Sequence, residues 1–132
     1  MKALILGFAG LAMLAGPAAA APQSKPAEPA RQCFYSRDIT SWREAGNQAV
    51  NLQVNNRDVY HLELMGPCPQ LRFTGERIGV KTRRGDPIIC GGLDIDVLVP
   101  QPGGGLPTIC PVTQITKLTP DEVKALPKGQ RP

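Results

Sequence analysis

The chain has 132 residues, of which 42% are hydrophobic and 5% aromatic, and its 15 basic against 11 acidic residues give a formal net charge of +4. This length suits one small domain, and the basic residues are interspersed with acidic ones rather than gathered in one segment. The composition therefore argues against a nucleic-acid-binding protein, whose basic residues would cluster on one face.

The first residues have the pattern of a secretory signal peptide. A positively charged start precedes an apolar run over residues 3–15 and a small-residue exit over residues 16–20. The apolar run is too short to cross a bilayer, and no later stretch is apolar enough to form a membrane span. We therefore predict a signal peptide at residues 1–20, cleavage after Ala20, and a periplasmic or secreted protein.

Two short segments come before the first clear strand. Residues 21–32 are rich in Pro and Ala and predict a disordered lead. Ser41 and Glu44 then have the spacing of a capping box, with Gly46 as a stop. This pattern predicts a short helical turn that carries Trp42.

Residues 50–64 predict a β-hairpin. Its alternating apolar residues are Val50, Leu52, Val54, Tyr60, Leu62 and Leu64. A two-residue loop at residues 55–56 would place the two apolar sets on opposite faces, whereas a three-residue loop at residues 55–57 pairs Leu52 with Tyr60. Asparagine tolerates the left-handed conformation that such a loop needs, so we predict the three-residue loop.

The remaining elements are short. In chain order they are one helical turn at residues 70–73, a strand around residues 78–80, a half-buried strand at residues 93–99, a flexible loop at residues 101–107 and a last strand at residues 110–118. Thr119, Pro120 and Glu122 then supply an N-cap, a proline in the first turn and a capping-box acid. They predict a short helix to residue 126, followed by a disordered tail at residues 127–132.

These elements define a fold class, because strands outnumber helices and no β-α-β pattern occurs. We predict a mainly β fold, a small antiparallel barrel or sandwich of about five strands with short flanking helices and disulfide staples. It forms a single domain over residues 33–126.

The chain has four cysteines, an even number in a segment predicted to be exported, which indicates two disulfides. Zinc is disfavoured by the lack of a C-x-x-C pair and by the single histidine, so we expect neither a metal nor another cofactor. Of three pairings we predict Cys68–Cys90, which joins the corner after the hairpin to the strand beginning near Ile88. Cys33–Cys110 then ties the two ends of the domain.

Few side chains offer chemistry, and we predict no catalytic residue. His61 is the only imidazole and points away from the core, where an exposed structural role competes with catalysis. Asp94 and Asp96 share one face of the predicted strand; paired carboxylates perform acid–base work or bind calcium, and a charged solvent face is the simpler role. Trp42 and Tyr35 either line a ligand groove or pack in the core. These five residues are the candidate ligand-binding residues.

Taken together, the motifs resemble one known group of proteins. They are CF-x(7)-W at residues 33–42, Y-x-L-x-L-x-GPCP-x-L at residues 60–71, IC-x(3)-D at residues 89–94 and C-x-V-x(2)-I-x(2)-LTP-x-E at residues 110–122. This pattern is similar to a family of small exported four-cysteine bacterial proteins classed as a domain of unknown function. The resemblance implies a Gram-negative envelope setting and a shared fold, and it supplies no catalytic residues.

Two functional hypotheses follow. Export, disulfides and the lack of a catalytic motif favour a non-catalytic binding or interaction module of the periplasmic cell envelope. Its partner would be an envelope protein or a small ligand of unknown identity, bound on a sheet face or at residues 101–107, and we expect a monomer. The alternative is a small hydrolase or lyase that uses His61 or the pair of Asp94 and Asp96.

Overall fold

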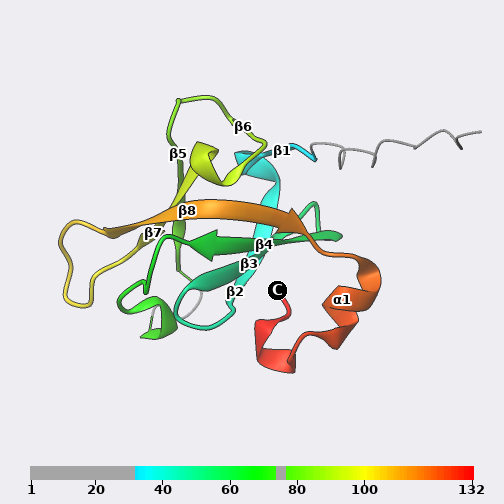
Figure 1. The fold of residues 1–132 in the computed structure, drawn as a ribbon. Coiled ribbons are helices and arrows are strands. Elements are labelled where there is room, and N and C mark those ends of the chain that lie inside the picture. The colour runs from blue at the N-terminus through cyan, green and yellow to red at the C-terminus, as the bar shows by residue number, and fades with distance from the viewer. Residues whose placement is uncertain (1–31, 74–76) are drawn as a thin grey trace, which may run out of the picture. The chain divides into compact units, whose positions relative to one another are not determined.

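The computed structural model describes residues 32–73 and 77–132. The predicted signal peptide at residues 1–20 lies outside the described residues, as does the predicted lead at residues 21–32 except for its last residue. Within the described residues, eight strands form two antiparallel sheets (Figure 1).

The larger sheet has six strands in the order β2-β3-β4-β8-β7-β5 and curls into a half-barrel, while β1 pairs with β6 (Figure 1). The strands are β1 (Phe34–Tyr35), β2 (Ile39–Glu44), β3 (Ala49–Val54), β4 (Asp58–Leu64), β5 (Gly79–Thr82), β6 (Ile88–Ile89), β7 (Ile95–Val99) and β8 (Thr108–Lys117). The helices are α1 (Pro120–Ala125) and the 3-10 turns η1 (Ser36–Asp38), η2 (Leu71–Phe73), η3 (Gly92–Asp94) and η4 (Lys128–Gln130). The predicted mainly β, disulfide-stapled fold is confirmed, with more strands than the sequence indicated.

The hairpin formed by β3 and β4 has the predicted register. Leu52 lies opposite Tyr60, and the strand pairing stops on either side of loop residues 55–57. Asn55 and Asn56 take positive φ values of 53° and 55°, the left-handed conformation that asparagine tolerates. A slip of one residue would turn the apolar side chains of one strand outward, so the hydrophobic alternation determines the loop length.

The hydrophobic core fills the inside of the curled sheet. Its most deeply buried side chains are Val50, Leu52, Val54, Leu62, Leu71, Ile89, Ile95, Val97, Val99 and Val112. Phe34 of the small sheet joins this core, since it is buried and its ring centroid lies 4.5 Å from that of Tyr60. The two-stranded sheet is therefore anchored to the six-stranded one by an aromatic contact.

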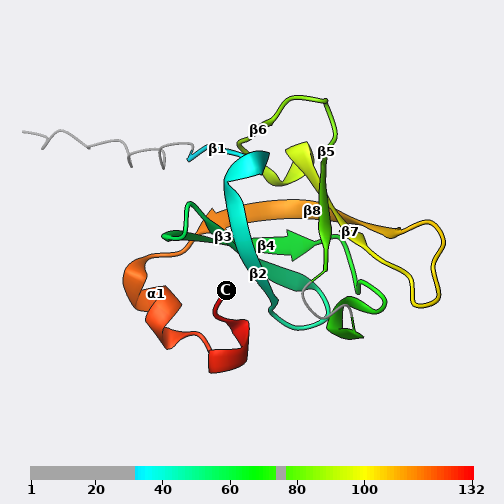
Figure 2. The same cartoon turned by 180° about the vertical axis from the view of Figure 1, so that it is seen from behind.

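The C-terminal segment covers the opposite face of the hairpin. Asn51 on β3 is fully buried although it is polar, and its side-chain Nδ2 donates a hydrogen bond of 2.8 Å to the carbonyl oxygen of Gln130. The Leu118 amide donates to the carbonyl of Val59, which is 3% exposed, and η4 contacts β2 (Figure 2). Both faces of β3 are thus covered, which explains why almost all of its residues are buried.

The capping prediction for α1 is confirmed. The Thr119 amide donates to Glu122 Oε2 at 2.7 Å, and the Glu122 amide donates to Thr119 Oγ1 at 3.3 Å. The structure differs from the prediction at residues 127–132, where we expected a disordered tail and where η4 forms. The reason is a long-range one, because the buried Asn51 amide needs an acceptor and Gln130 supplies it.

Two local predictions are wrong. Residues 41–44, read as a capped helical turn, belong to β2, where Trp42 lies opposite Leu52 of β3. The ladder with β3 satisfies the backbone groups of this segment and overrides the short capping pattern. The strand predicted from residue 93 begins at Ile95, because Leu93 lies in η3 and is 63% exposed.

The predicted disulfide pairing is also wrong. The disulfides are Cys33–Cys90 and Cys68–Cys110, in place of Cys68–Cys90 and Cys33–Cys110. Antiparallel pairing of β1 with β6 brings the neighbouring Cys33 and Cys90 to a Cα–Cα distance of 4.2 Å. Strand β8 pairs directly with β4, so Cys110 on β8 meets Cys68, which follows β4, at 5.8 Å.

Candidate binding groove

An open groove of about 600 Å³ lies beside the Cys33–Cys90 disulfide. It is formed by the segment between β5 and β6, by β6 itself and by η3. Its lining combines charged Arg84 and Asp86, apolar Ile88 and Leu93, and residues 90–92 with Asp94. The groove therefore offers both apolar surface and polar groups of each charge.

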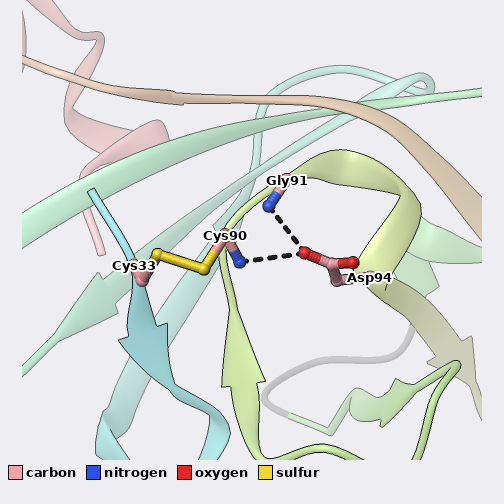
Figure 3. Close-up of a disulfide and its surroundings, with 4 residues drawn as sticks. All are labelled: Cys33, Cys90, Gly91 and Asp94. Atoms are coloured by element: carbon pink, nitrogen blue, oxygen red, sulfur yellow. Dashed lines mark hydrogen bonds between the residues drawn. A yellow bond between two sulfur atoms is a disulfide. The ribbon is translucent and has the colours of Figure 1, made fainter. Parts of the chain in front are cut away.

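Asp94 fixes the backbone on one side of the groove. Its Oδ2 atom accepts hydrogen bonds from the amides of Cys90 at 3.0 Å and Gly91 at 2.9 Å (Figure 3). Its carbonyl oxygen accepts a bond of 2.9 Å from the amide of Arg83. The carboxylate therefore caps the short turn η3, since it satisfies amide groups that the turn leaves without a partner.

Gly92 fixes the same turn against β8. It is buried, and a Cβ atom at this position would lie 2.4 Å from the carbonyl carbon of Thr113. Thr113 is the extra residue of an irregularity in the pairing of β4 with β8, and its hydroxyl donates to the Glu63 carbonyl at 3.2 Å. Only glycine permits this close approach of two backbone segments.

The disulfide closes the wall of the groove on the side of the small sheet. Cys90 lines the groove, and its bond to Cys33 ties the start of β1 to the end of β6 (Figure 3). The Ser36 amide also donates a bond of 2.8 Å to the carbonyl of Pro87. The groove is thus bounded by a covalent link, a capped turn and a close glycine contact.

The rim of the groove exposes large apolar side chains. Leu93 is 63% and Ile88 41% exposed, and Tyr35 lies opposite Ile88 in the small sheet with 40% exposure. The guanidinium of Arg37 lies 4.7 Å from the centre of the Tyr35 ring. We call Ile88 and Leu93, which line the groove, the apolar rim.

The two carboxylates of the predicted pair, Asp94 and Asp96, have separate partners. Asp94 serves as the cap described above, whereas Asp96 on β7 makes an ion pair with Arg83, with 2.6 Å between Arg83 Nη2 and Asp96 Oδ1. Arg83 Nε also donates to the same oxygen at 2.7 Å. Each carboxylate therefore has its own structural partner. The two residues also belong to different elements, since Asp94 lies in η3 and Asp96 in β7.

His61 lies elsewhere, in the network under the C-terminal segment. Its Nδ1 atom is 2.7 Å from Asn51 Oδ1, while the Asn51 Nδ2 donates to Gln130. Because the amide oxygen only accepts, Nδ1 of His61 carries the proton in this contact. The imidazole thus helps to hold residues 118–132 on the hairpin, which is a structural use of the side chain.

The five predicted ligand-binding residues are not brought together. Asp94 lines the groove and Tyr35 pairs with its lining residue Ile88, whereas Trp42 is half-buried on β2 and packs against the core. Sequence reasoning missed Ile88 and Leu93, because the apolar alternation placed them in strands and exposure cannot be read from that pattern. A weak signal was present in the Gly91-Gly92 pair, which marks a break before Leu93.

The described residues contain no group of three or more histidine, cysteine, aspartate or glutamate side chains placed to hold a metal ion. They also contain no helix long and apolar enough to cross a membrane. A smaller depression of about 240 Å³, lined among others by Met65 and Ile109, lies beside Cys110. It differs from the groove in having no charged residue in its lining.

Comparison with known proteins identifies the family of the chain. The family model described as Family of unknown function (DUF6491) matches residues 1–132, which confirms the resemblance to a domain of unknown function. No curated protein and no solved structure matches the chain. The description of the family names no activity, so the function must be inferred from the groove itself.

Proposed function

The chain belongs to a family of unknown function (DUF6491), and from its own geometry we propose that it is an exported, non-catalytic binding module of the cell envelope. In this proposal the groove beside Cys90 holds a small ligand or a segment of an envelope protein. The observation that carries the proposal is an open groove of about 600 Å³ whose rim exposes Ile88 and Leu93. Exposed apolar side chains gathered around a concave surface are typical of binding sites.

The construction of the groove supports binding rather than chance exposure. The disulfide at Cys90, the Asp94 cap and the Gly92 contact restrain η3 and the residues before it in the absence of a ligand. A preformed site loses little conformational freedom on binding, so more of the contact energy appears as affinity. Arg84 and Asp86 at the same groove would orient a polar group of the ligand.

The structural roles of the candidate catalytic residues weigh against the alternative, a small hydrolase or lyase. His61 contacts Asn51, Asp94 caps η3, and Asp96 pairs with Arg83. General acid–base catalysis needs a group that reaches the reacting atom in a concave site. Only Asp94 of these three lines the groove, and its Oδ2 atom already accepts two amide hydrogen bonds.

Two observations support an exported location. Both disulfides, Cys33–Cys90 and Cys68–Cys110, suit an oxidising compartment. Residues 1–20 have the charge, apolar run and small-residue exit of a signal peptide. Together they support a periplasmic or secreted protein.

The test compares two matched leucine substitutions in a strain that lacks the protein. Leu93→Ser removes an apolar side chain from the rim, and Leu106→Ser removes a 90% exposed leucine from the loop between β7 and β8. We expect Leu93→Ser to lose complementation of the deletion phenotype and Leu106→Ser to keep it, with equal thermal stability. Full complementation by Leu93→Ser and by Ile88→Ser would contradict the proposed groove.

The enzyme alternative is tested by a second set of variants. His61→Ala and Asp96→Asn remove side chains that a hydrolase or lyase would use and that do not line the groove. We expect each folded variant to complement the deletion, because the groove and its rim remain. Loss of complementation by a variant with unchanged melting temperature would favour the enzyme.

A further inference from the structure

The two disulfides differ in their access to solvent. Cys68 and Cys110 are 4% and 5% exposed and belong to the core cluster. Cys33 and Cys90 are both exposed, and Cys90 also lines the groove. A thiolate exchanges with a disulfide only when it reaches one of the two sulfur atoms, so access separates the two bonds chemically.

We propose that the Cys33–Cys90 disulfide is a site of thiol–disulfide exchange, at which a thiolate that enters the groove attacks Cys90. Both cysteines are exposed, and of the two only Cys90 lines the groove, so a thiolate seated in the groove lies on the Cys90 side of the bond. The exchange needs only this access, whereas its effect on a bound ligand rests on the proposed function of the groove.

The chemistry balances with two thiols as the reductant. The sulfur of the first thiolate bonds to Cys90 Sγ, the bond between the two cysteine sulfurs breaks, and its electron pair leaves on Cys33 Sγ as a thiolate. A second thiolate then attacks the incoming sulfur of this mixed disulfide and releases Cys90 as a thiolate. Two thiols become one disulfide, and the protein gains two electrons and two protons.

Reduction would loosen the groove without unfolding the domain. Phe34 stays buried against Tyr60, and the Ser36 amide still bonds to the Pro87 carbonyl, so β1 keeps its noncovalent anchors. The covalent tie at Cys90 is lost, and this tie bounds the groove. The exchange would therefore change the shape of the proposed binding site.

The attacking thiolate has two sources with the same chemistry, a small thiol or the dithiol of a protein. The apolar rim distinguishes them, since a small thiol needs no apolar contact to reach Cys90, whereas a protein partner would rest on Leu93, which is 63% exposed. The comparison therefore uses reduced glutathione and a thioredoxin-type dithiol protein as probes, each on the native chain and on Leu93→Ser.

The experiment follows reduction of the oxidised native protein by iodoacetamide trapping and peptide mapping. We expect Cys33 and Cys90 to be alkylated at least about tenfold faster than Cys68 and Cys110, because the second pair, at 4% and 5% exposure, offers a thiolate far less access. We also expect the glutathione mixed disulfide, trapped by rapid acidification, on Cys90. Equal rates for the two pairs, or a mixed disulfide on Cys33, would overturn the proposal.

Comparing the reduction rates of Leu93→Ser with those of the native chain then identifies the source of the attacking thiolate. A lower rate only with the dithiol protein points to a protein thiol, and unchanged rates with both probes point to a small thiol; both results support exchange at Cys90. Neither measurement contains a groove ligand. Failure of the exchange therefore leaves the complementation test of the groove standing, and failure of that test leaves the exchange rates unaffected.

Discussion

The Cys33–Cys90 and Cys68–Cys110 disulfides close loops of similar length but lie in opposite surroundings. Their sequence separations are 57 and 42 residues, so loop entropy alone gives both about 4 kcal/mol of stabilisation. One bond lies at the surface beside the groove, and the other packs in the core. The difference indicates that similar covalent links serve different ends, one stabilising the core and one bounding the groove.

The largest expected effect comes from removing the buried bond. Replacing Cys68 and Cys110 by Ala loses the loop constraint and leaves a cavity in the core, which together should cost about 5 kcal/mol or more. Replacing Cys33 and Cys90 by Ala should cost at most about 4 kcal/mol, because no core packing is lost. The measurement is urea unfolding of both double variants. A greater loss of unfolding free energy on removing Cys33 and Cys90 would contradict the larger stabilising role of the buried bond.

The second effect tests the contact that holds η3 on β8. Gly92→Ala places a Cβ atom 2.4 Å from the Thr113 backbone, which cannot move without disturbing the sheet. We expect a loss of about 3 kcal/mol in the free energy of unfolding. Gly91→Ala is the matched control, because its Cβ atom would meet only Asp94 Oδ2 at 3.9 Å and its φ of −151° suits any residue. Equal losses of unfolding free energy in the two variants would show that the close approach of Gly92 to Thr113 does not require glycine.

The third effect concerns the cap of the groove. Asp94→Ala removes the acceptor of two amide hydrogen bonds, from Cys90 and Gly91, and should cost about 1–2 kcal/mol. Asp86→Ala is the control, since this aspartate is exposed and should change stability by less than about 0.5 kcal/mol. Hydrogen exchange should show faster amides at residues 90–94 in the first variant only. Unchanged hydrogen exchange at residues 90–94 would show that the Asp94 carboxylate does not stabilise this turn.

The smallest effect is a pH dependence at the contact that links the surface disulfide to the core. Burial raises the pKa of Tyr60 above its ordinary value of 10.0, while Lys117 lowers it and Asp58 raises it by smaller amounts. The unfolded chain therefore loses its proton at lower pH than the folded one, so stability should fall as the pH rises above about 10. Urea unfolding between about pH 9 and pH 11 measures this slope.

Tyr60→Phe serves as the control for that measurement. This variant keeps the ring beside Phe34 and removes the titrating hydroxyl, so its stability should fall less steeply over the same pH range. A steeper fall in the variant, or a rise in native stability above about pH 10, would contradict the assigned sign.

The sequence predicted what depends on neighbours along the chain. The hairpin register followed from hydrophobic alternation, and the reciprocal bonds of Thr119 with Glu122 followed from the capping pattern. The same reasoning failed for Ser41 and Glu44, because pairing of β2 with β3 outweighs a local capping pattern. Local chemistry predicts an element well only where no distant strand competes for its backbone groups.

The disulfide pairing and the groove depend on which distant segments become neighbours. Strand β8 lies between β4 and β7 in the sheet, which brings Cys110 to Cys68. This strand order cannot be predicted from any local sequence pattern. The exposure of Leu93 likewise follows from the Asp94 cap, which turns the chain before β7 begins. Of the residues that line the groove, only Asp94 was among the predicted candidates, and its hydrogen bonds to the amides of Cys90 and Gly91 could not be predicted from the sequence.

Non-reducing peptide mapping of the purified protein tests the structure of the groove directly, because its wall at Cys90 depends on the bond from Cys90 to Cys33. After proteolysis without a reductant and with free thiols blocked, we expect two linked peptides, one joining Cys33 to Cys90 and the other joining Cys68 to Cys110. Peptides that link Cys68 to Cys90 and Cys33 to Cys110 would contradict the arrangement of the small sheet, the wall of the groove and the exchange site together.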